Sequence, residues 1–262
     1  MDAKGKVAIV TGSATGVGAE VARQLAERGC NVVINYTKSE AEARESEAAC
    51  AALGVETLLV QADVSRDEDC RRMAQAALDK WGRIDVLVNN AGTSKFVAHD
   101  DLEGLTAEDF QRIYAVNVIG PYQMTRAVAP AMKSQGAGSV VMISSLAGVR
   151  GVGSSIAYAA SKGALNNMTM SLARALGPEI RVNTVCPGFI DTRWLRTGLG
   201  AEKFDAMKDA VARSNPLKAA STPVEVAEPV IYFALSARHT TGETLLVDAG
   251  THLGQAARMP QR

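Results

Sequence analysis

The chain has 262 residues, and its 28 Lys and Arg residues balance its 28 Asp and Glu residues, so the formal net charge is zero. A protein that binds nucleic acid through its phosphates needs an excess of positive charge, which this composition lacks. The hydrophobic fraction of 47% and the charged fraction of 21% are ordinary for a folded domain and exclude a disordered chain. We therefore expect a single compact domain over residues 1–262 and no nucleic-acid partner.

Targeting and metal-binding patterns are missing from the sequence. The first apolar run, Val7–Val10, is too short for the core of a signal peptide, which needs at least about 7 apolar residues. No run approaches the roughly 18 apolar residues of a membrane helix, so we expect a cytoplasmic protein with no membrane partner. The four cysteines are isolated along the chain and predict free thiols, with no metal site.

Short β-branched runs alternate with longer amphipathic stretches in chain order. The predicted strands cover residues 7–10, 31–36, 57–60, 84–88, 139–143, 181–185 and 244–247. The predicted helices cover residues 16–28, 39–53, the charged stretch from Asp63 to Trp81, 106 to about 133, 157–176, and a segment that begins at Thr222-Pro223. Such strands are covered on both faces and pair in parallel through right-handed crossovers. The pattern predicts an α/β fold with a doubly wound, mostly parallel sheet of about seven strands.

The segment from about Thr192 to Pro216 does not match a layer of such a sheet. In a doubly wound fold it would hang over the carboxyl ends of the strands, where ligands bind. We therefore expect residues 192–216 to form a substrate lid, with Trp194 and Phe204 closing over an apolar substrate.

A glycine-rich turn, TGSATGVG, follows the first predicted strand at residues 11–18. Glycines in this position let the chain turn tightly and let backbone N–H groups approach a pyrophosphate at the positive end of a helix dipole. A turn without a ligand is the alternative interpretation. The spacing of Gly12, Gly16 and Gly18 is G-x-x-x-G-x-G, which differs from the commoner G-x-G-x-x-G.

That spacing, together with the motifs that follow it, resembles the short-chain dehydrogenase/reductase family. The motifs that stand in the family's order are Asn89-Asn90-Ala91-Gly92, Asn117, Ser145, Tyr158-x-x-x-Lys162 and Pro187-Gly188. The resemblance implies a Rossmann-type single domain, nicotinamide-dependent hydride transfer, and a homotetramer or homodimer. Within the family the chain is similar to 3-oxoacyl-carrier-protein reductases and to bacterial sugar dehydrogenases.

The resemblance also implies four catalytic residues: Asn117, Ser145, Tyr158 and Lys162. Tyr158 and Lys162 are four residues apart on a predicted helix and so emerge on one face. An ammonium about 4 Å from the phenol is worth on the order of 4 kcal/mol, enough to bring its pKa from about 10 to near 7. A solvated tyrosine and a lysine extended along the helix surface are the alternative for an isolated Y-x-x-x-K.

The other two residues have supporting roles by the resemblance. Ser145 would hydrogen-bond the substrate oxygen, with its neighbour Ser144 as the competing candidate. Asn117 would fix the backbone and position a water molecule beside Lys162 in a proton relay. A polar residue that merely bends a helix is the alternative for Asn117.

The end of the second predicted strand indicates which nicotinamide cofactor the protein uses. An acidic residue at this position would bind a ribose 2′-OH. This position carries Tyr36, Thr37, Lys38 and Ser39, with no acid. Two hydroxyls and an ammonium suit a 2′-phosphate, so NADP(H) is favoured and NAD(H) is the alternative. The resemblance implies further contacts: Asp63 with the adenine, unless it caps the next helix, and Thr192 with the nicotinamide carboxamide. The predicted cofactor residues are Gly12, Ser13, Thr15, Gly16, Val17, Gly18, Tyr36, Thr37, Lys38, Ser39, Asp63, Val64, Asn90, Ala91, Gly92, Tyr158, Lys162, Pro187, Gly188, Ile190 and Thr192.

The leading hypothesis is an oxidoreductase that transfers a hydride between NADP(H) and a small-molecule carbonyl or secondary alcohol, with Tyr158 as general acid and base. The alternative is a redox sensor or scaffold that binds the nucleotide without turnover. The tail from Thr251 to Arg262 has no apolar pattern, and we expect it to fray or to lie in a subunit interface.

Overall fold

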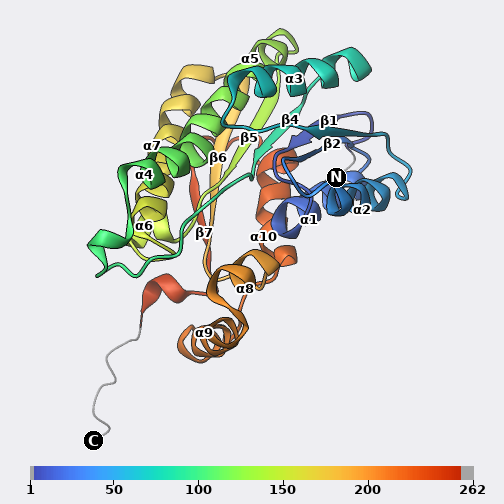
Figure 1. Ribbon diagram of the computed structural model, residues 1–262. Coiled ribbons are helices and arrows are strands. Elements are labelled where there is room, and N and C mark those ends of the chain that lie inside the picture. The colour runs from blue at the N-terminus through green and yellow to red at the C-terminus, as the bar shows by residue number, and fades with distance from the viewer. Residues whose placement is uncertain (1–2, 255–262) are drawn as a thin grey trace, which may run out of the picture.

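The computed structural model describes residues 3–254, which form one α/β domain around a seven-stranded parallel sheet (Figure 1). The strands are β1 (Val7–Val10), β2 (Asn31–Tyr36), β3 (Thr57–Gln61), β4 (Val86–Asn89), β5 (Gly138–Ile143), β6 (Ile180–Pro187) and β7 (Thr244–Val247). Their order is β3-β2-β1-β4-β5-β6-β7, and every pair is parallel. The doubly wound sheet predicted from the sequence is confirmed. The strand order reverses between β1 and β4, the place where such sheets bind ligands at their carboxyl edge.

Two helical layers cover the sheet (Figure 1). One layer holds α1 (Gly16–Glu27), α2 (Glu40–Ala51) and α10 (Pro223–Ile231), whose buried residues share one core cluster. The other holds α3 (Asp67–Trp81), α5 (Gly120–Ser134) and α7 (Ile156–Leu176), which share the second cluster. In β1, Ala8 and Val10 belong to the first cluster, whereas Val7 and Ile9 belong to the second. This alternation explains why the strands are apolar at every position.

The structure corrects three element boundaries. The fourth strand begins at Val86 rather than at residue 84, and the carboxylate of the preceding Asp85 accepts a hydrogen bond from the Val7 N–H at 2.9 Å. The helix predicted over 106–133 is divided into α4 (Ala107–Tyr114), a π-helical turn (Ala115–Ile119) and α5. A short helix, α6 (Ala147–Arg150), lies in the expected loop before α7.

The segment expected to stand outside the layers contains two helices, α8 (Arg193–Leu199) and α9 (Ala201–Ser214). Figure 1 shows both below the sheet, beyond its carboxyl edge. Residues 251–253 form a short 3-10 turn, and the rest of the tail, residues 255–262, lies outside the described residues. No helix within residues 3–254 is long and apolar enough to span a bilayer. All four cysteines are buried free thiols.

One backbone position after β7 is strained. Ala249 has a φ of +55°, in the left-handed region where a Cβ atom costs about 1–2 kcal/mol, whereas the next residue, Gly250, adopts a φ of +82° without that cost. The turn is held because the Asp248 carboxylate accepts a hydrogen bond from the Gly250 N–H at 3.0 Å.

We expect Ala249→Gly to raise the free energy of unfolding by about 0.5–1 kcal/mol, because the relief of strain exceeds the entropy that glycine adds to the unfolded chain. Urea denaturation measures the change. Ala48→Gly, on the exposed face inside α2, is the matched control and should lower stability by about 1 kcal/mol. Equal losses in both variants would contradict the assignment of strain to Ala249.

Candidate active site

The turn after β1 and the loop after β4 are locked together by hydrogen bonds at the switch point of the sheet. The Thr11 hydroxyl accepts hydrogen bonds from the N–H groups of Asn90 and Ala91, each at 3.0 Å. In return the Asn90 side-chain amide donates to the carbonyls of Thr11 at 2.9 Å and Gly12 at 3.0 Å. A Cβ atom on Gly18 would lie 2.4 Å from the Asn90 Nδ2 atom, so only glycine permits this packing.

Gly16 has a different role from Gly12 and Gly18. A Cβ atom on Gly12 would meet the Ala91 Cα atom at 3.0 Å, whereas one on Gly16 would meet only the Thr192 Cγ2 atom, at 3.8 Å. Gly16 therefore faces the space between the glycine turn and the start of α8. Its φ of +60° turns the chain into α1, whose amino-terminal N–H groups face the same edge. A bare backbone at a helix start, bordered by a gap, fits the pyrophosphate of a dinucleotide.

Asn35 supports the glycine turn and was missed by the sequence analysis. It is buried in β2, where its side-chain oxygen accepts a hydrogen bond from the Gly12 N–H at 2.9 Å. Its side-chain amide donates to the carbonyls of Val60 at 3.2 Å and Ala62 at 3.0 Å. A single polar residue inside the apolar run NVVINY was the available signal, because a buried amide must find partners.

The end of β2 presents the groups predicted for a ribose phosphate. Tyr36 is buried, whereas Thr37 and Lys38 are exposed. The acids that follow in α2 are paired: Glu40 with Arg44 at 2.7 Å, and Glu42 with Arg193 of α8 at 2.8 Å. These ion pairs partly offset the negative charge of the two glutamates. The surroundings of Lys38 therefore favour the binding of an anion.

Asp63 lies at the same edge but does not cap α3. Its carboxylate accepts hydrogen bonds from the Ser65 N–H at 2.9 Å and the Ser65 hydroxyl at 2.7 Å, while Arg66 occupies the cap position of α3. The cap interpretation is therefore wrong, and the adenine contact stays a prediction.

The other residues predicted for the cofactor lie near the same edge. A Cβ atom on Gly188 would meet the Asp248 Cβ atom at 2.7 Å, so Gly188 is required for packing after β6. Thr192 caps α8, where its hydroxyl accepts a hydrogen bond from the Leu195 N–H at 3.5 Å. The remaining ones are buried or partly buried, except the exposed Thr15 and Gly92: Ser13, Thr15, Val17, Ser39, Val64, Gly92, Pro187 and Ile190.

Tyr158 and Lys162 lie on one face of α7, which begins where the Ser155 hydroxyl accepts a hydrogen bond from the Tyr158 N–H at 3.3 Å. The Lys162 side chain is 3% exposed, and its ammonium donates to the carbonyl of Ile143, the last residue of β5, at 2.8 Å. The Lys162 Nζ atom lies 5.6 Å from the centre of the Tyr158 ring. The alternative of two solvated surface side chains is wrong.

Ser145 and Ser144 point to different partners. The Ser145 hydroxyl accepts a hydrogen bond from the Ala147 N–H at 3.1 Å and lies near enough to the Tyr158 phenol to oppose the rise in its pKa. The buried Ser144 hydroxyl instead donates to the carbonyl of Lys162 at 3.1 Å. The geometry therefore favours Ser145 over Ser144 as the hydroxyl beside the phenol.

The protonation of the pair differs from the sequence-based expectation. Burial raises the pKa of Tyr158 to about 12, and the hydrogen bond with Ser145 only partly opposes this. Burial also lowers the pKa of Lys162 to about 8. The expected phenol pKa near 7 differs from this value for the protein alone, because removal from water raises the pKa of the phenol and Ser145 only partly opposes the rise. With its pKa raised, the phenol keeps its proton at neutral pH and can donate it.

Asn117 fixes the loop after β4. Its side-chain oxygen accepts a hydrogen bond from the Thr93 N–H at 2.8 Å, and its amide donates to the Thr93 carbonyl at 2.9 Å and to the Ser161 hydroxyl at 3.0 Å. It sits in the π-helical turn, a widened geometry common at functional sites. A Cβ atom on Gly92 would lie 3.5 Å from the Asn117 Oδ1 atom and 3.7 Å from the Lys162 Nζ atom, so both atoms border one small space.

The structure separates the two aromatic residues expected in the lid. Trp194 lies 6.1 Å from Tyr158, measured between ring centres. Phe204 is fully buried, with its ring 5.4 Å from that of Phe189 and beneath the Arg196 guanidinium. The expectation that Phe204 closes over a substrate is therefore wrong, because its ring anchors α9 to the chain after β6.

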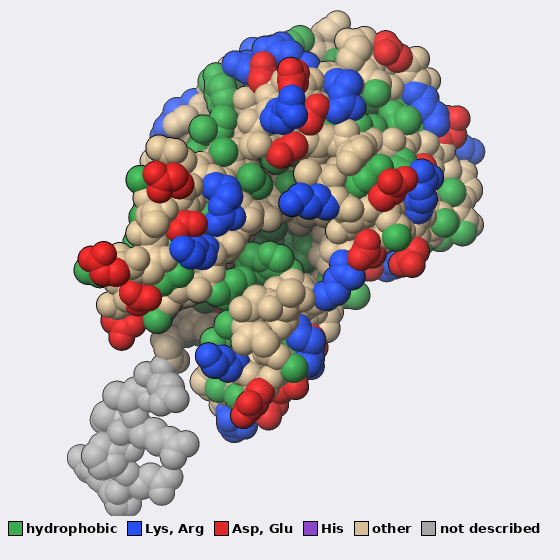
Figure 2. Space-filling view, in the orientation of Figure 1, with side chains coloured by type: hydrophobic (Ala, Val, Ile, Leu, Met, Phe, Trp, Pro, Cys, Tyr) green, Lys and Arg blue, Asp and Glu red, His purple; other side chains and the backbone are tan. Residues whose placement is uncertain are grey.

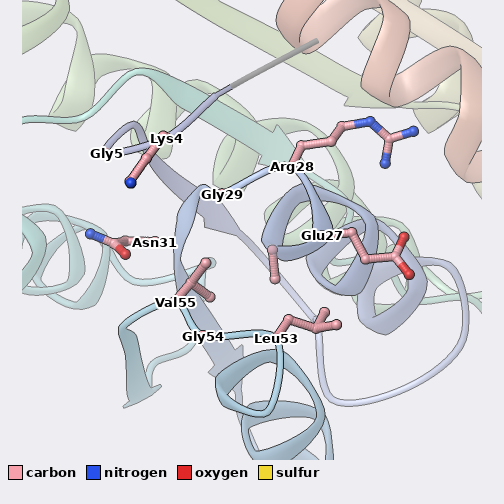
Figure 3. A pocket seen from close by; sticks show the side chains of 10 residues that line it. Lys4, Gly5, Glu27, Arg28, Gly29, Asn31, Leu53, Gly54 and Val55 are labelled. Atoms are coloured by element: carbon pink, nitrogen blue, oxygen red, sulfur yellow. The ribbon is translucent and has the colours of Figure 1, made fainter.

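A cavity of about 630 Å³ lies at the opposite edge of the sheet. It is formed by the turns before β1, β2 and β3. Figure 3 shows the charged side chains of Lys4, Glu27 and Arg28 pointing in different directions rather than converging. Without convergent polar groups it offers no chemistry comparable to the carboxyl edge.

Comparisons with known proteins agree with this geometry. A family model described as enoyl-(acyl carrier protein) reductase matches residues 12–252. A protein of Streptomyces violaceoruber, assigned as ketoacyl reductase 2 of the granaticin polyketide synthase, is 42% identical over 247 residues, which cover 94% of this chain and 96% of the relative. The 3-oxoacyl-(acyl-carrier-protein) reductase of Staphylococcus epidermidis is 32% identical over 250 residues, covering 95% and 99% of the two chains.

A crystal structure assigned to the short-chain dehydrogenase/reductases, from Burkholderia xenovorans, superposes with a TM-score of 0.89 at 39% identity, covering 97% of this chain and all of the other. The matched region holds the glycine turn and the site described above. The chain therefore belongs to the short-chain dehydrogenase/reductase family and is an oxidoreductase that uses a nicotinamide cofactor.

Proposed function

We propose that this protein reduces a small-molecule ketone to a secondary alcohol with NADP(H), or catalyses the reverse oxidation, with Tyr158 as the general acid and base. The observation that carries the proposal is that the Tyr158 ring centre lies 5.6 Å from the buried Lys162 ammonium and that the Ser145 hydroxyl is near enough to act on the phenol. A site with a protonated phenol and a hydroxyl side by side can bind and protonate a carbonyl oxygen.

The residues divide the reduction into separate tasks. A reduced nicotinamide held at this edge would supply the hydride that the carbonyl carbon gains. Tyr158 donates its proton to the carbonyl oxygen, so the ketone gains one hydride and one proton and becomes an alcohol. Ser145 hydrogen-bonds the same oxygen and stabilises the negative charge that develops on it. The glycine turn, Asn90 and Thr192 hold the cofactor against this edge.

Lys162 stabilises the phenolate that remains after proton donation. Its ammonium is oriented by the Ile143 carbonyl and lies in a site from which water is largely excluded, which strengthens its attraction for negative charge. Asn117 borders the same small space and supports a path by which Tyr158 regains a proton through water and Lys162.

The preference for NADP(H) is supported by Thr37, Lys38 and the lack of an unpaired acid at the end of β2. The closing of α8 and α9 over the site as a lid is supported by the Arg193–Glu42 ion pair, which joins the start of α8 to α2. A homotetramer or homodimer is supported by apolar side chains exposed on the α5 and α7 layer, such as Tyr122 and Met170.

Tyr158→Phe should lower kcat for ketone reduction by at least about a thousand-fold, because the variant has no proton to donate. Binding of NADPH, measured by titration calorimetry, should stay within a few-fold of the unchanged protein. Tyr232→Phe is the control. Tyr232 is exposed and is not one of the site residues, so the change should leave kcat unaltered. Retention of the protein's full activity by Tyr158→Phe would favour the alternative of a nucleotide sensor or scaffold without turnover.

The kcat/KM for NADPH should fall as the pH rises through about 8, because the Lys162 ammonium loses its proton there. In Lys162→Arg the guanidinium stays charged, so any residual activity should be flat between about pH 7 and pH 9. Initial rates across this range test the assignment. A decline of the same shape in both proteins would assign it to another group.

Lys38→Glu should lower kcat/KM for NADPH about ten- to a hundred-fold and leave the value for NADH unchanged or raised, because a charge-assisted hydrogen bond to the 2′-phosphate becomes a repulsion. Lys133→Glu makes the same charge change in the last turn of α5 and should affect neither cofactor. An equal loss with NADPH and NADH in Lys38→Glu would remove the basis for NADP(H) preference.

A further inference from the structure

Three aromatic rings from three separate elements lie together, and one of them belongs to Tyr158, the proposed proton donor. Phe96 comes from the loop after β4, Tyr158 from α7 and Trp194 from α8. The Phe96 and Trp194 rings have centres 5.5 Å apart and are tilted by 53°, and the Tyr158 and Trp194 rings have centres 6.1 Å apart and are tilted by 41°. These separations are typical of attractive aromatic pairs, with Trp194 between the other two.

The Phe96 ring is seated in a notch of α8. A Cβ atom on Gly198 would lie 2.0 Å from the Phe96 ring, so only glycine lets the helix rest on it. Gly198 is four residues beyond Trp194 and therefore shares its face of the helix. The loop is tied in turn to the residues before α7, because the Val97 N–H donates to the Ser154 carbonyl at 2.8 Å and the hydroxyls of Ser94 and Ser154 are 2.6 Å apart. The pair of rings is thus fixed relative to Tyr158.

Trp194 remains 44% exposed in spite of its two aromatic neighbours. Figure 2 shows a hollow between the body of the molecule and the α8–α9 region, with hydrophobic side chains on its floor. Gly153 lies beside the Tyr158 ring, since a Cβ atom there would be 3.0 Å from the Ala147 Cβ atom and 3.7 Å from the ring, so the missing side chain leaves this side of the ring open. A flat group can therefore lie against the indole while its carbonyl reaches the phenol.

The basic side chains around this wall are already engaged. Lys95 pairs with Asp109 at 2.7 Å, and Arg196 with Asp205 at 2.7 Å. Lys208 pairs with Asp191, and Arg193 pairs with Glu42. A phosphorylated or carboxylate substrate would have to displace one of these partners, so the surroundings favour a neutral substrate.

We propose that Phe96 and Trp194 form a stacking wall that selects neutral ketones bearing an aromatic ring over ketones with a linear alkyl chain. The proposal rests on the proposed reductase function and narrows its substrate class. Trp194 acts as a specificity-determining residue, because a flat ring gains contact on an indole face that a flexible chain covers less completely.

The test compares 4-phenyl-2-butanone with 2-decanone, two ten-carbon methyl ketones that differ in whether the chain ends in an aromatic ring. We expect the protein to show at least a tenfold higher kcat/KM for the aryl ketone, with NADPH or NADH as reductant. Trp194→Leu should lower that ratio at least tenfold, because kcat/KM falls more for the aryl ketone than for 2-decanone. Trp81→Leu, at the end of α3, is the matched control and should keep the original ratio.

A second readout does not need turnover. Trp81→Phe leaves Trp194 as the one tryptophan, since the chain has two, and 4-phenyl-2-butanone should then quench the indole fluorescence saturably and more strongly than 2-decanone. A ratio that is unchanged in Trp194→Leu, or quenching that does not differ between the ketones, overturns the stacking wall and leaves the reductase function standing. Two results together overturn the reductase function itself. Neither ketone is reduced with either cofactor, and Tyr158→Phe keeps the full biological activity of the unchanged protein.

Discussion

The burial of the Lys162 ammonium is the constraint on which the site depends. Lowering its pKa from 10.5 to about 8 corresponds to a cost on the order of 3 kcal/mol at neutral pH, and the surrounding packing sustains that cost. The Ile143 carbonyl holds the charge in place at the end of β5, next to the Tyr158 ring. An arrangement that stabilised the folded state alone would place an apolar residue there, so the buried charge is a cost to stability that the proposed catalysis explains.

The Lys162 charge lies at the carboxyl edge of the sheet. At the same edge, hydrogen bonds join the two strands between which the strand order reverses. Thr11 and Asn90 join the ends of β1 and β4, and Gly18 is bare because the Asn90 amide occupies the place of a side chain. Gly16 also lacks a side chain, and it faces the space beside Thr192. One short motif therefore meets two demands, close packing within the protein and an open backbone for a ligand, which explains its glycine spacing.

Residues 192–216 show which features the sequence pattern could not predict. Their position outside the layers followed from the pattern, but the roles of their two aromatic side chains did not. Phe204 turned inward to Phe189, and Trp194 turned toward Tyr158. Which face of α8 or α9 meets the body depends on contacts with distant residues, such as Phe96 against Gly198, which no local pattern records.

The sequence by itself determined the seven parallel strands to within about two residues, the position of the glycine turn and the shared face of Tyr158 and Lys162. These features follow from local periodicity and helical spacing. The tertiary structure alone decided that Asn35 braces the glycine turn, that Ser145 rather than Ser144 meets the phenol, and that burial raises the Tyr158 pKa. Hydrogen-bond partners and exclusion from water are set by residues far apart in the chain, so they exist only once the layers have packed.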